Sequence, residues 1–190
     1  MKKMLTLWLI ALMILTLAGC GAASTEGGAD VDTKAAIEAI MDSARAALGD
    51  TVFVPTTFTD AITAETSENM LGLTAAELEE YAMEAYVMIA GILTHPFQIA
   101  LVKCKDYKSA TEVKKLIADG FNSAKWVCVF PDQSFVVESG RFVLLGAVPN
   151  EAAEAFQKSF SDQFNTKAGT VNTFYDGADA EGGGGGLLLP

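Results

Sequence analysis

Residues 135–148 read FVVESGRFVLLGAV. The apolar runs on either side of Ser139-Gly140 are rich in β-branched and aromatic residues, which favours two strands. A glycine supplies the positive φ that a tight turn needs, so this sequence predicts a hairpin between Phe135–Glu138 and Arg141–Val148. It is the clearest hairpin pattern in the chain. The other predicted elements are described below by their position in the sequence before or after it.

A second hairpin is predicted upstream of the first. Ala85–Ile92 and Phe97–Cys104 are apolar and rich in Val, Ile and aromatic residues, and a short segment that ends at Pro96 separates them. We therefore expect these two runs to form antiparallel strands around a short turn. Together the two hairpins supply four strands.

A helix is expected after each hairpin. After the upstream hairpin, Asp106 or Ser109 can serve as the N-cap, and after the downstream hairpin Pro149-Asn150 opens the helix. Each helix has one apolar stripe at helical spacing. The stripes consist of Ala110, Val113, Ile117 and Phe121 in the first helix, and of Ala152, Phe156, Phe160 and Phe164 in the second. The order strand, strand, helix thus occurs twice.

Two further helices are predicted before the first hairpin. Asp32 is a suitable N-cap for a helix with one buried stripe, Ile37–Leu48. Thr74 and Glu77 have the spacing of a capping box, which starts a short helix. Between these helices, Thr51–Thr66 has no clear apolar period, so we expect irregular surface chain with one short extended piece.

These elements predict an α+β fold in a single domain over residues 32–165. Its sheet is expected to have four mainly antiparallel strands, built from two strand-strand-helix units, with the helices on one face. The N-terminal helix is expected at an edge or end of the sheet. Residues 166–190 end in Gly182–Gly186 and three leucines. We expect a disordered tail there, because nothing repays the entropy of ordering five consecutive glycines.

The N-terminus has the pattern of a lipoprotein signal peptide. Lys2 and Lys3 precede an apolar run of about thirteen residues, fewer than the roughly twenty that cross a bilayer. The run closes with Leu17-Ala18-Gly19-Cys20, small residues directly before a cysteine. We expect residues 1–19 to be removed, Cys20 to receive a diacylglyceryl group, and residues 20–31 to form a flexible tether. An ordinary secretory signal is the alternative, but it does not need the cysteine.

The charge of the chain argues against nucleic acid as a partner. The chain has 13 basic and 24 acidic residues, and removal of Lys2 and Lys3 with the signal leaves 11 basic residues and a net charge of −13. Such a surface repels phosphate backbones and anionic lipid headgroups. We therefore expect contact with the membrane through the lipid on Cys20, not through charge.

The sequence contains no strong motif for catalysis, metal or cofactor binding. His95 is the one histidine, and any His-based metal site or nucleophile would need it. It lies in a predicted turn, where a solvated histidine is the usual finding. An acidic set could be read as a metal or general-acid cluster, but we interpret it as a solvated helix face with its negative charge near the helix N-terminus; it consists of Glu77, Glu79, Glu80 and Glu84.

Cys104 and Cys128 remain once Cys20 is lipidated. Outside the cytoplasm an even pair of cysteines suggests a disulfide. However, one cysteine ends a predicted strand and the other follows the next helix, and a disulfide needs Cα atoms within about 7 Å. We therefore favour two separate buried thiols, with a disulfide as the alternative.

Four stretches share a pattern with a known family. They are Met70-Leu71-Gly72-Leu73, Leu78-Glu79-Glu80-Tyr81, the run Phe97–Asp106 that leads into a helix, and Ser139–Leu145. With the cysteine motif at residues 17–20, this set resembles the uncharacterised bacterial lipoproteins of the domain-of-unknown-function 4358 family. The resemblance covers most of residues 1–165. It implies a small α+β domain on a lipid anchor, mostly in Gram-positive bacteria, and carries over no catalytic residue.

The function expected from the sequence is that of a non-catalytic binding or interaction module. Its lipid would hold it on the extracytoplasmic face of the cell membrane, where it would bind an unknown protein or small molecule. Two alternatives are an envelope-associated enzyme and an accessory solute-binding component of a transporter. The enzyme alternative expects His95 to share one cleft with two or more carboxylates.

Overall fold

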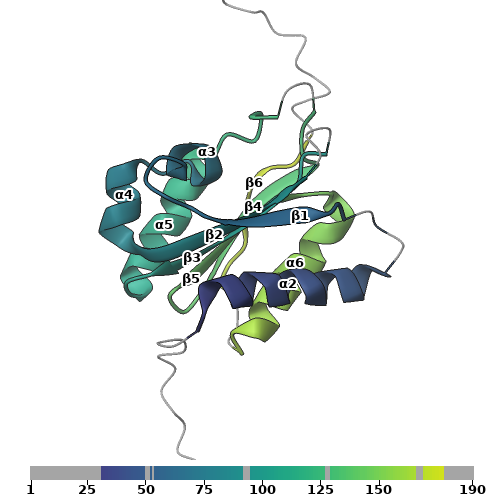
Figure 1. Ribbon diagram of the computed structural model, residues 1–190, viewed down its shortest axis with the longest axis horizontal. Helices are drawn as coiled ribbons and strands as arrows, with labels where there is room; N and C mark the ends of the chain where they lie inside the picture. Colours follow the sequence, from purple (N-terminus) through teal and green to yellow (C-terminus); the bar gives the residue numbers. More distant parts are fainter. Residues whose placement is uncertain are drawn as a thin grey trace, which may run out of the picture.

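The computed structural model of the chain describes residues 31–49, 52, 54–91, 95–126, 129–165 and 169–177. Figure 1 shows a central sheet with helices on both sides of it. In chain order, the elements are α2 Thr33–Leu48, β1 Thr57–Ala61, α3 Ser67–Leu71, α4 Ala75–Tyr81, β2 Ala82–Ala90, β3 Gln98–Cys104, α5 Tyr107–Gly120, β4 Gln133–Ser139, β5 Phe142–Val148, α6 Asn150–Gln163 and β6 Asn172–Tyr175. The predicted signal peptide and residues 20–30 of the predicted tether lie outside the described residues.

The six strands of the described chain form one antiparallel sheet in the order β1-β2-β3-β5-β4-β6. The two predicted hairpins are β2–β3 and β4–β5, and they join through β3 and β5 at the centre. Gly140 makes the predicted turn with a φ of 60°. The α+β class and the antiparallel sheet are confirmed.

The prediction of four strands is wrong, because β1 and β6 add one strand at each edge. Each edge strand pairs on one side only, with β2 and β4 respectively. Their side chains are exposed or only partly buried, so neither strand needs the apolar pattern that reveals a central strand. The strand β1 lies in the segment that was expected to be irregular.

The strand β6 also corrects the predicted boundary of the domain. It lies within residues 166–190, which the sequence analysis assigned to a disordered tail. The described part of that range pairs with β4, and the Gly169 N–H donates to the Glu138 carbonyl at 2.7 Å. Thr, Phe and Tyr in this strand favour extended structure, and the glycines that dominated the prediction follow only later.

Helices cover both faces of the sheet, so the prediction that they lie on one face is wrong (Figure 1). The helices α2 and α6 pack on one face, and α3, α4 and α5 pack on the other. The cause lies in β3 and β5, in which every residue is buried. A strand covered on both faces needs apolar side chains that point both ways, and these strands are apolar almost throughout.

The two strand-strand-helix units are present, but they are not related by symmetry. A twofold axis that exchanges the antiparallel strands β3 and β5 must stand perpendicular to the sheet. Such an axis keeps each face on its own side, so it would place α5 and α6 on the same face. They lie on opposite faces, and the repeat is therefore one of element order alone.

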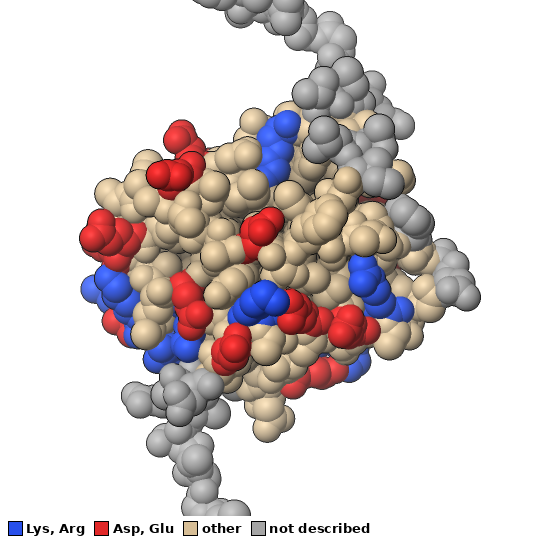
Figure 2. Space-filling view, in the orientation of Figure 1, with Lys and Arg blue, Asp and Glu red and all other residues tan. Residues whose placement is uncertain are grey.

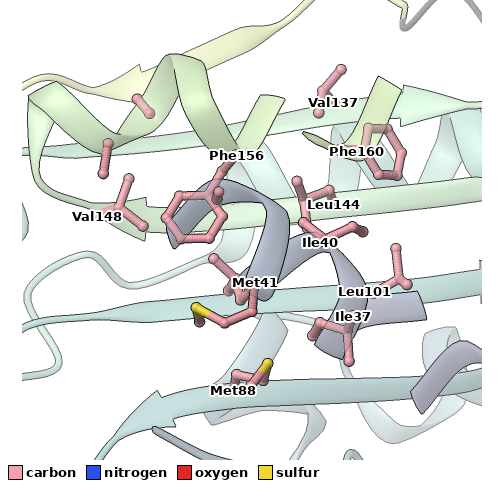
Figure 3. Packing of buried hydrophobic residues seen from close by; sticks show 14 of the residues in the cluster. Ile37, Ile40, Met41, Met88, Leu101, Val137, Leu144, Val148, Phe156 and Phe160 are labelled. Atoms are coloured by element: carbon pink, nitrogen blue, oxygen red, sulfur yellow. The ribbon is translucent and has the colours of Figure 1, made fainter. Parts of the chain in front are cut away.

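The layer formed by α2 and α6 contains most of the buried aromatic side chains of the described chain. Its packing is visible in Figure 3, where labelled helix residues Ile37, Ile40, Met41, Phe156 and Phe160 meet strand residues Met88, Leu101, Val137, Leu144 and Val148. Phe156 and Phe160 have no exposed surface, which confirms the predicted stripe of α6. Burying one such side chain stabilises the fold by about 1.5–3 kcal/mol.

The predicted helix starts are confirmed by their capping hydrogen bonds. Asp32 Oδ1 accepts from the Ala35 N–H at 3.0 Å at the start of α2. Thr74 and Glu77 form the reciprocal capping box of α4. Asp106, not Ser109, caps α5, and its carboxylate accepts from a backbone N–H at 2.7 Å. These caps fix where each helix leaves the preceding chain.

Candidate ligand-binding site

The surface charge does not mark a site. On the face in Figure 2, acidic and basic side chains are interspersed, and wide uncharged areas lie between them. No helix in the described ranges is long and apolar enough to cross a membrane. The candidate groups are therefore the buried polar side chains and the cavities.

The predicted cysteine sites are only partly within the described residues. Cys20 and Cys128 lie outside them. Cys104 is buried and free, as the preference for separate thiols predicts. Burial raises the pKa of the Cys104 thiol to about 12. A thiol of this kind is an unreactive part of the core, because the thiolate is the nucleophile.

The acidic set around α4 does not form one cluster. Glu77 is used in the capping box, whereas Glu84 pairs with Lys103 at 3.1 Å between Oε1 and Nζ. Within the part of the chain that the structure describes, no three His, Cys, Asp or Glu side chains are grouped to hold a metal ion. Glu77 and Glu84 therefore serve the local structure.

His95 lines a pocket of about 190 Å³ with several prolines and aromatic residues. Asp132 is the one carboxylate among the described residues that line this pocket. The enzyme alternative expects two or more carboxylates beside His95, and the described lining does not provide them. A wider groove of about 350 Å³ lies between α4 and β2, and its acidic residues are Glu79 and Glu84.

A third cavity combines a ligand-sized volume with buried polar side chains. We call it the Lys125 pocket. It has a volume of about 180 Å³ and lies where α3, the end of β2, the start of β3 and the segment after α5 meet. Its lining residues are Asn69, Met70, Ile89, Ala90, Gln98, Lys125 and Trp126. The walls are mixed, with four apolar residues beside Asn69, Gln98 and Lys125.

Lys125 is held in this pocket by two acceptors and two aromatic rings. Its Nζ donates to the Asn69 carbonyl at 2.8 Å and to Gln98 Oε1 at 2.5 Å. The same nitrogen lies 4.9 Å from the ring centroid of Phe121 and 5.0 Å from that of Trp126. Both distances are within the range of a cation–π contact. Lys125 makes no salt bridge with any described carboxylate.

Gln98 fixes the position of the ammonium group. Its side chain is fully buried, and its Nε2 donates to the Met70 carbonyl at 2.7 Å. Because this bond uses the amide NH₂, the amide oxygen is turned toward Lys125. The carbonyls of Asn69 and Met70 come from the C-terminal part of α3. The end of α3 and the start of β3 thus orient the side chains of Gln98 and Lys125.

The positive charge of Lys125 is not balanced by a described acidic side chain at close range. Burial lowers the pKa of Lys125 to about 8 from its ordinary value of 10.5, because the charged form loses solvation. The group is still mainly protonated at neutral pH. An anion beside Lys125 would offset the lost solvation, which no described acidic side chain does at close range.

Sequence reasoning did not select Lys125 or Gln98 as site residues. Gln98 gave a weak signal, since it is a polar residue at the start of the apolar strand β3. Lys125 gave another, because it stands next to Trp126 between two predicted elements. Neither sequence feature shows that Lys125 and Gln98 are in contact. That contact depends on how α3 packs on the sheet.

Comparisons with protein-family models, with curated proteins and with solved structures find no match to this chain. The resemblance to bacterial lipoproteins drawn from the sequence therefore stays a prediction.

Proposed function

We propose that this chain is a lipoprotein anchored through Cys20 on the extracytoplasmic face of the cell membrane, and that its folded domain is a non-catalytic binding module. We assign the Lys125 pocket as its ligand site. The observation that carries this assignment is an ammonium group in a ligand-sized cavity, partly buried, oriented by two acceptors and without a described carboxylate partner.

The position of the pocket supports this function. The first described residue, Val31, is the last residue of the proposed tether, and its carbonyl accepts from Lys103 Nζ at 2.9 Å. Lys103 is near the end of β3, whereas Gln98 begins that strand. At about 3.3 Å per residue, the two Cα atoms are about 17 Å apart. A lipid on Cys20 would therefore hold the domain by one end of β3, while the pocket lies at the other end.

The proposed site can be tested through its own tryptophan. The chain has two tryptophans, Trp8 and Trp126. Trp8 is removed with residues 1–19 in the proposed lipoprotein, and Trp8→Phe silences any unprocessed precursor, so the fluorescence of the full-length gene product purified in detergent reports on Trp126 alone. We expect a panel of single-ring fragments, with anionic, neutral and cationic members, to contain members that change this fluorescence saturably. If no fragment of any charge does so, the Lys125 pocket is not a ligand site.

A further inference from the structure

The sheet continues the Lys125 pocket toward its β1 edge. In the strand register, Gln98 of β3 is opposite Ile89 of β2, and Ile89 is opposite Phe58 of β1. Residues directly opposite each other in antiparallel strands place their side chains on the same face, with Cβ atoms about 4.5–5.5 Å apart. Gln98, Ile89 and Phe58 therefore form one row that leads from the ammonium group of Lys125 to the edge of the sheet.

Phe58 is an exposed aromatic side chain at the outer end of this row. It is 61% exposed, which places it among the few large apolar side chains on the surface of the described residues. Its ring lies over Gly91, where an added Cβ would be only 2.8 Å from Phe58 Cε2. The bare backbone of Gly91 thus lets the ring lie flat against the sheet. The row offers a ligand an apolar strip beside the charged end of the pocket.

The size of the pocket limits the ligand. An apolar protein cavity of about 150 Å³ is large enough to bind benzene. The Lys125 pocket has about 180 Å³, so it suits a single ring or a short branched chain with one small polar group. It does not have room for a nucleotide or a peptide.

The donors in the pocket limit the charge of the ligand. A lysine ammonium has three N–H donors, and two of those of Lys125 already donate to Asn69 and Gln98. Arginine, which binds phosphate through paired donors, is not among the lining residues. The net charge of −11 also disfavours multiply charged anions. One remaining N–H and one positive charge match a monoanion.

From these observations we infer that the Lys125 pocket binds a small organic carboxylate, whose carboxylate pairs with Lys125 and whose apolar body lies along Ile89 toward Phe58. This inference rests on the proposed function and specifies its ligand class. Phosphate-bearing ligands are the less favoured anions, because they would leave most of their oxygen atoms without donors.

The test uses the fluorescence of Trp126 in the full-length Trp8→Phe protein. Sodium benzoate is the probe, benzamide is its neutral counterpart, and acetate carries the same charge without the ring. We expect benzoate to bind about tenfold or more tightly than either, because benzamide lacks the charge that pairs with Lys125 and acetate lacks the ring that contacts the apolar strip. Inorganic phosphate is expected to bind no better than acetate.

Matched variants separate the ligand contact from the fold. Lys125→Met removes the charge at nearly constant length, and we expect it to weaken benzoate binding about tenfold or more. Lys108→Met removes an exposed lysine of α5, and benzoate binding should not change. Phe58→Ala should weaken the binding of benzoate but not of acetate.

The outcomes distinguish this inference from the proposed function. Equal binding of benzamide and benzoate, or unchanged benzoate binding in Lys125→Met, would overturn the carboxylate assignment while the pocket remained a ligand site. Tighter binding of phosphate than of benzoate would overturn it in the same way. A complete lack of response to every fragment would overturn both claims.

Discussion

Gly72 and Gly120 lie backbone against backbone where the end of α3 meets the end of α5. A Cβ on Gly72 would be 2.2 Å from the carbonyl carbon of Gly120, and a Cβ on Gly120 would be 2.4 Å from the carbonyl oxygen of Gly72. This contact excludes a side chain at both positions. It also sets the position of the α3 end, from which the Met70 carbonyl reaches Gln98 at the Lys125 pocket.

Gly72→Ala should destabilise the domain by about 2–4 kcal/mol. Left-handed backbone accounts for about 1 kcal/mol, since the φ of Gly72 is 74°, and overlap with Gly120 accounts for the remainder. Gly120→Ala tests the contact without the backbone contribution, because Gly120 has no positive φ but an added Cβ would still be 2.4 Å from the Gly72 carbonyl oxygen. Urea denaturation should give a loss of about 1–3 kcal/mol for Gly120→Ala. A Gly120→Ala variant as stable as the unmodified chain would contradict the close contact.

Phe160→Ala should lower the free energy of unfolding by about 3–5 kcal/mol. The side chain is fully buried, and its ring meets that of Phe164 with centroids 5.1 Å apart. Phe58→Ala removes an exposed ring and should cost little. Thermal melting of both variants measures the difference, and an unchanged melting curve for Phe160→Ala would show that this stripe of α6 is not part of the core.

Lys125 should make stability rise with pH in the alkaline range. Its folded pKa of about 8 lies below its ordinary value of 10.5, so between these values the unfolded chain binds more protons than the folded chain. The free energy of unfolding then increases with pH, here by up to about 3 kcal/mol from pH 8 to pH 10.5. Below pH 8 the cost of the buried charge is constant.

The comparison with Lys125→Met isolates this effect. Tyr81 and Cys104, whose pKa values are raised by hydrogen bonding and by burial respectively, titrate in both proteins and cancel in the difference. Urea denaturation at several pH values should show the unmodified chain gaining stability relative to the variant above pH 8. A difference that does not depend on pH would mean that Lys125 is well solvated in the folded state.

Cys104 should resist alkylation in the folded protein. Its side chain has no exposed surface, and its thiol pKa is about 12. We expect iodoacetamide at mildly alkaline pH to modify Cys104 only after denaturation, without any reductant. Mass spectrometry of the digested protein measures the alkylation of Cys104 directly. A cross-linked peptide that joins Cys104 to Cys128 under the same conditions would contradict the separate thiols.

The central elements of the fold could be predicted because their signals are local. Caps at Asp32 and Thr74 and the turn at Ser139-Gly140 each depend on neighbouring residues. The sequence also contains a pattern that indicates helices on both faces of the sheet. Phe142-Val143-Leu144-Leu145 is continuously apolar, and a strand of this kind is buried on both faces. The edge strands lack the apolar pattern of a central strand because their side chains are exposed or only partly buried, so Thr, Phe and Tyr in β6 were a weaker signal than the glycines that follow.

The candidate site could not be predicted, because its residues are distant in sequence. Lys125 and Gln98 are 27 residues apart, and Lys125 and Asn69 are 56 apart. Only the packing of α3 against the sheet brings them together. That packing depends on the close backbone contact between Gly72 and Gly120, which is possible because glycine has no Cβ. The predicted lipidation at Cys20, in contrast, depends on a contiguous motif and needs no folded structure.

The most direct test of the account is whether Cys20 carries the lipid that holds the domain on the membrane. Cells that express the full-length chain or its Cys20→Ser variant would be labelled with an alkyne fatty acid and fractionated. We expect the unmodified chain to label and to sediment with membranes, and the variant to stay unlabelled and to remain as precursor or appear in the medium. A Cys20→Ser variant that still labels and still sediments with membranes would contradict the account.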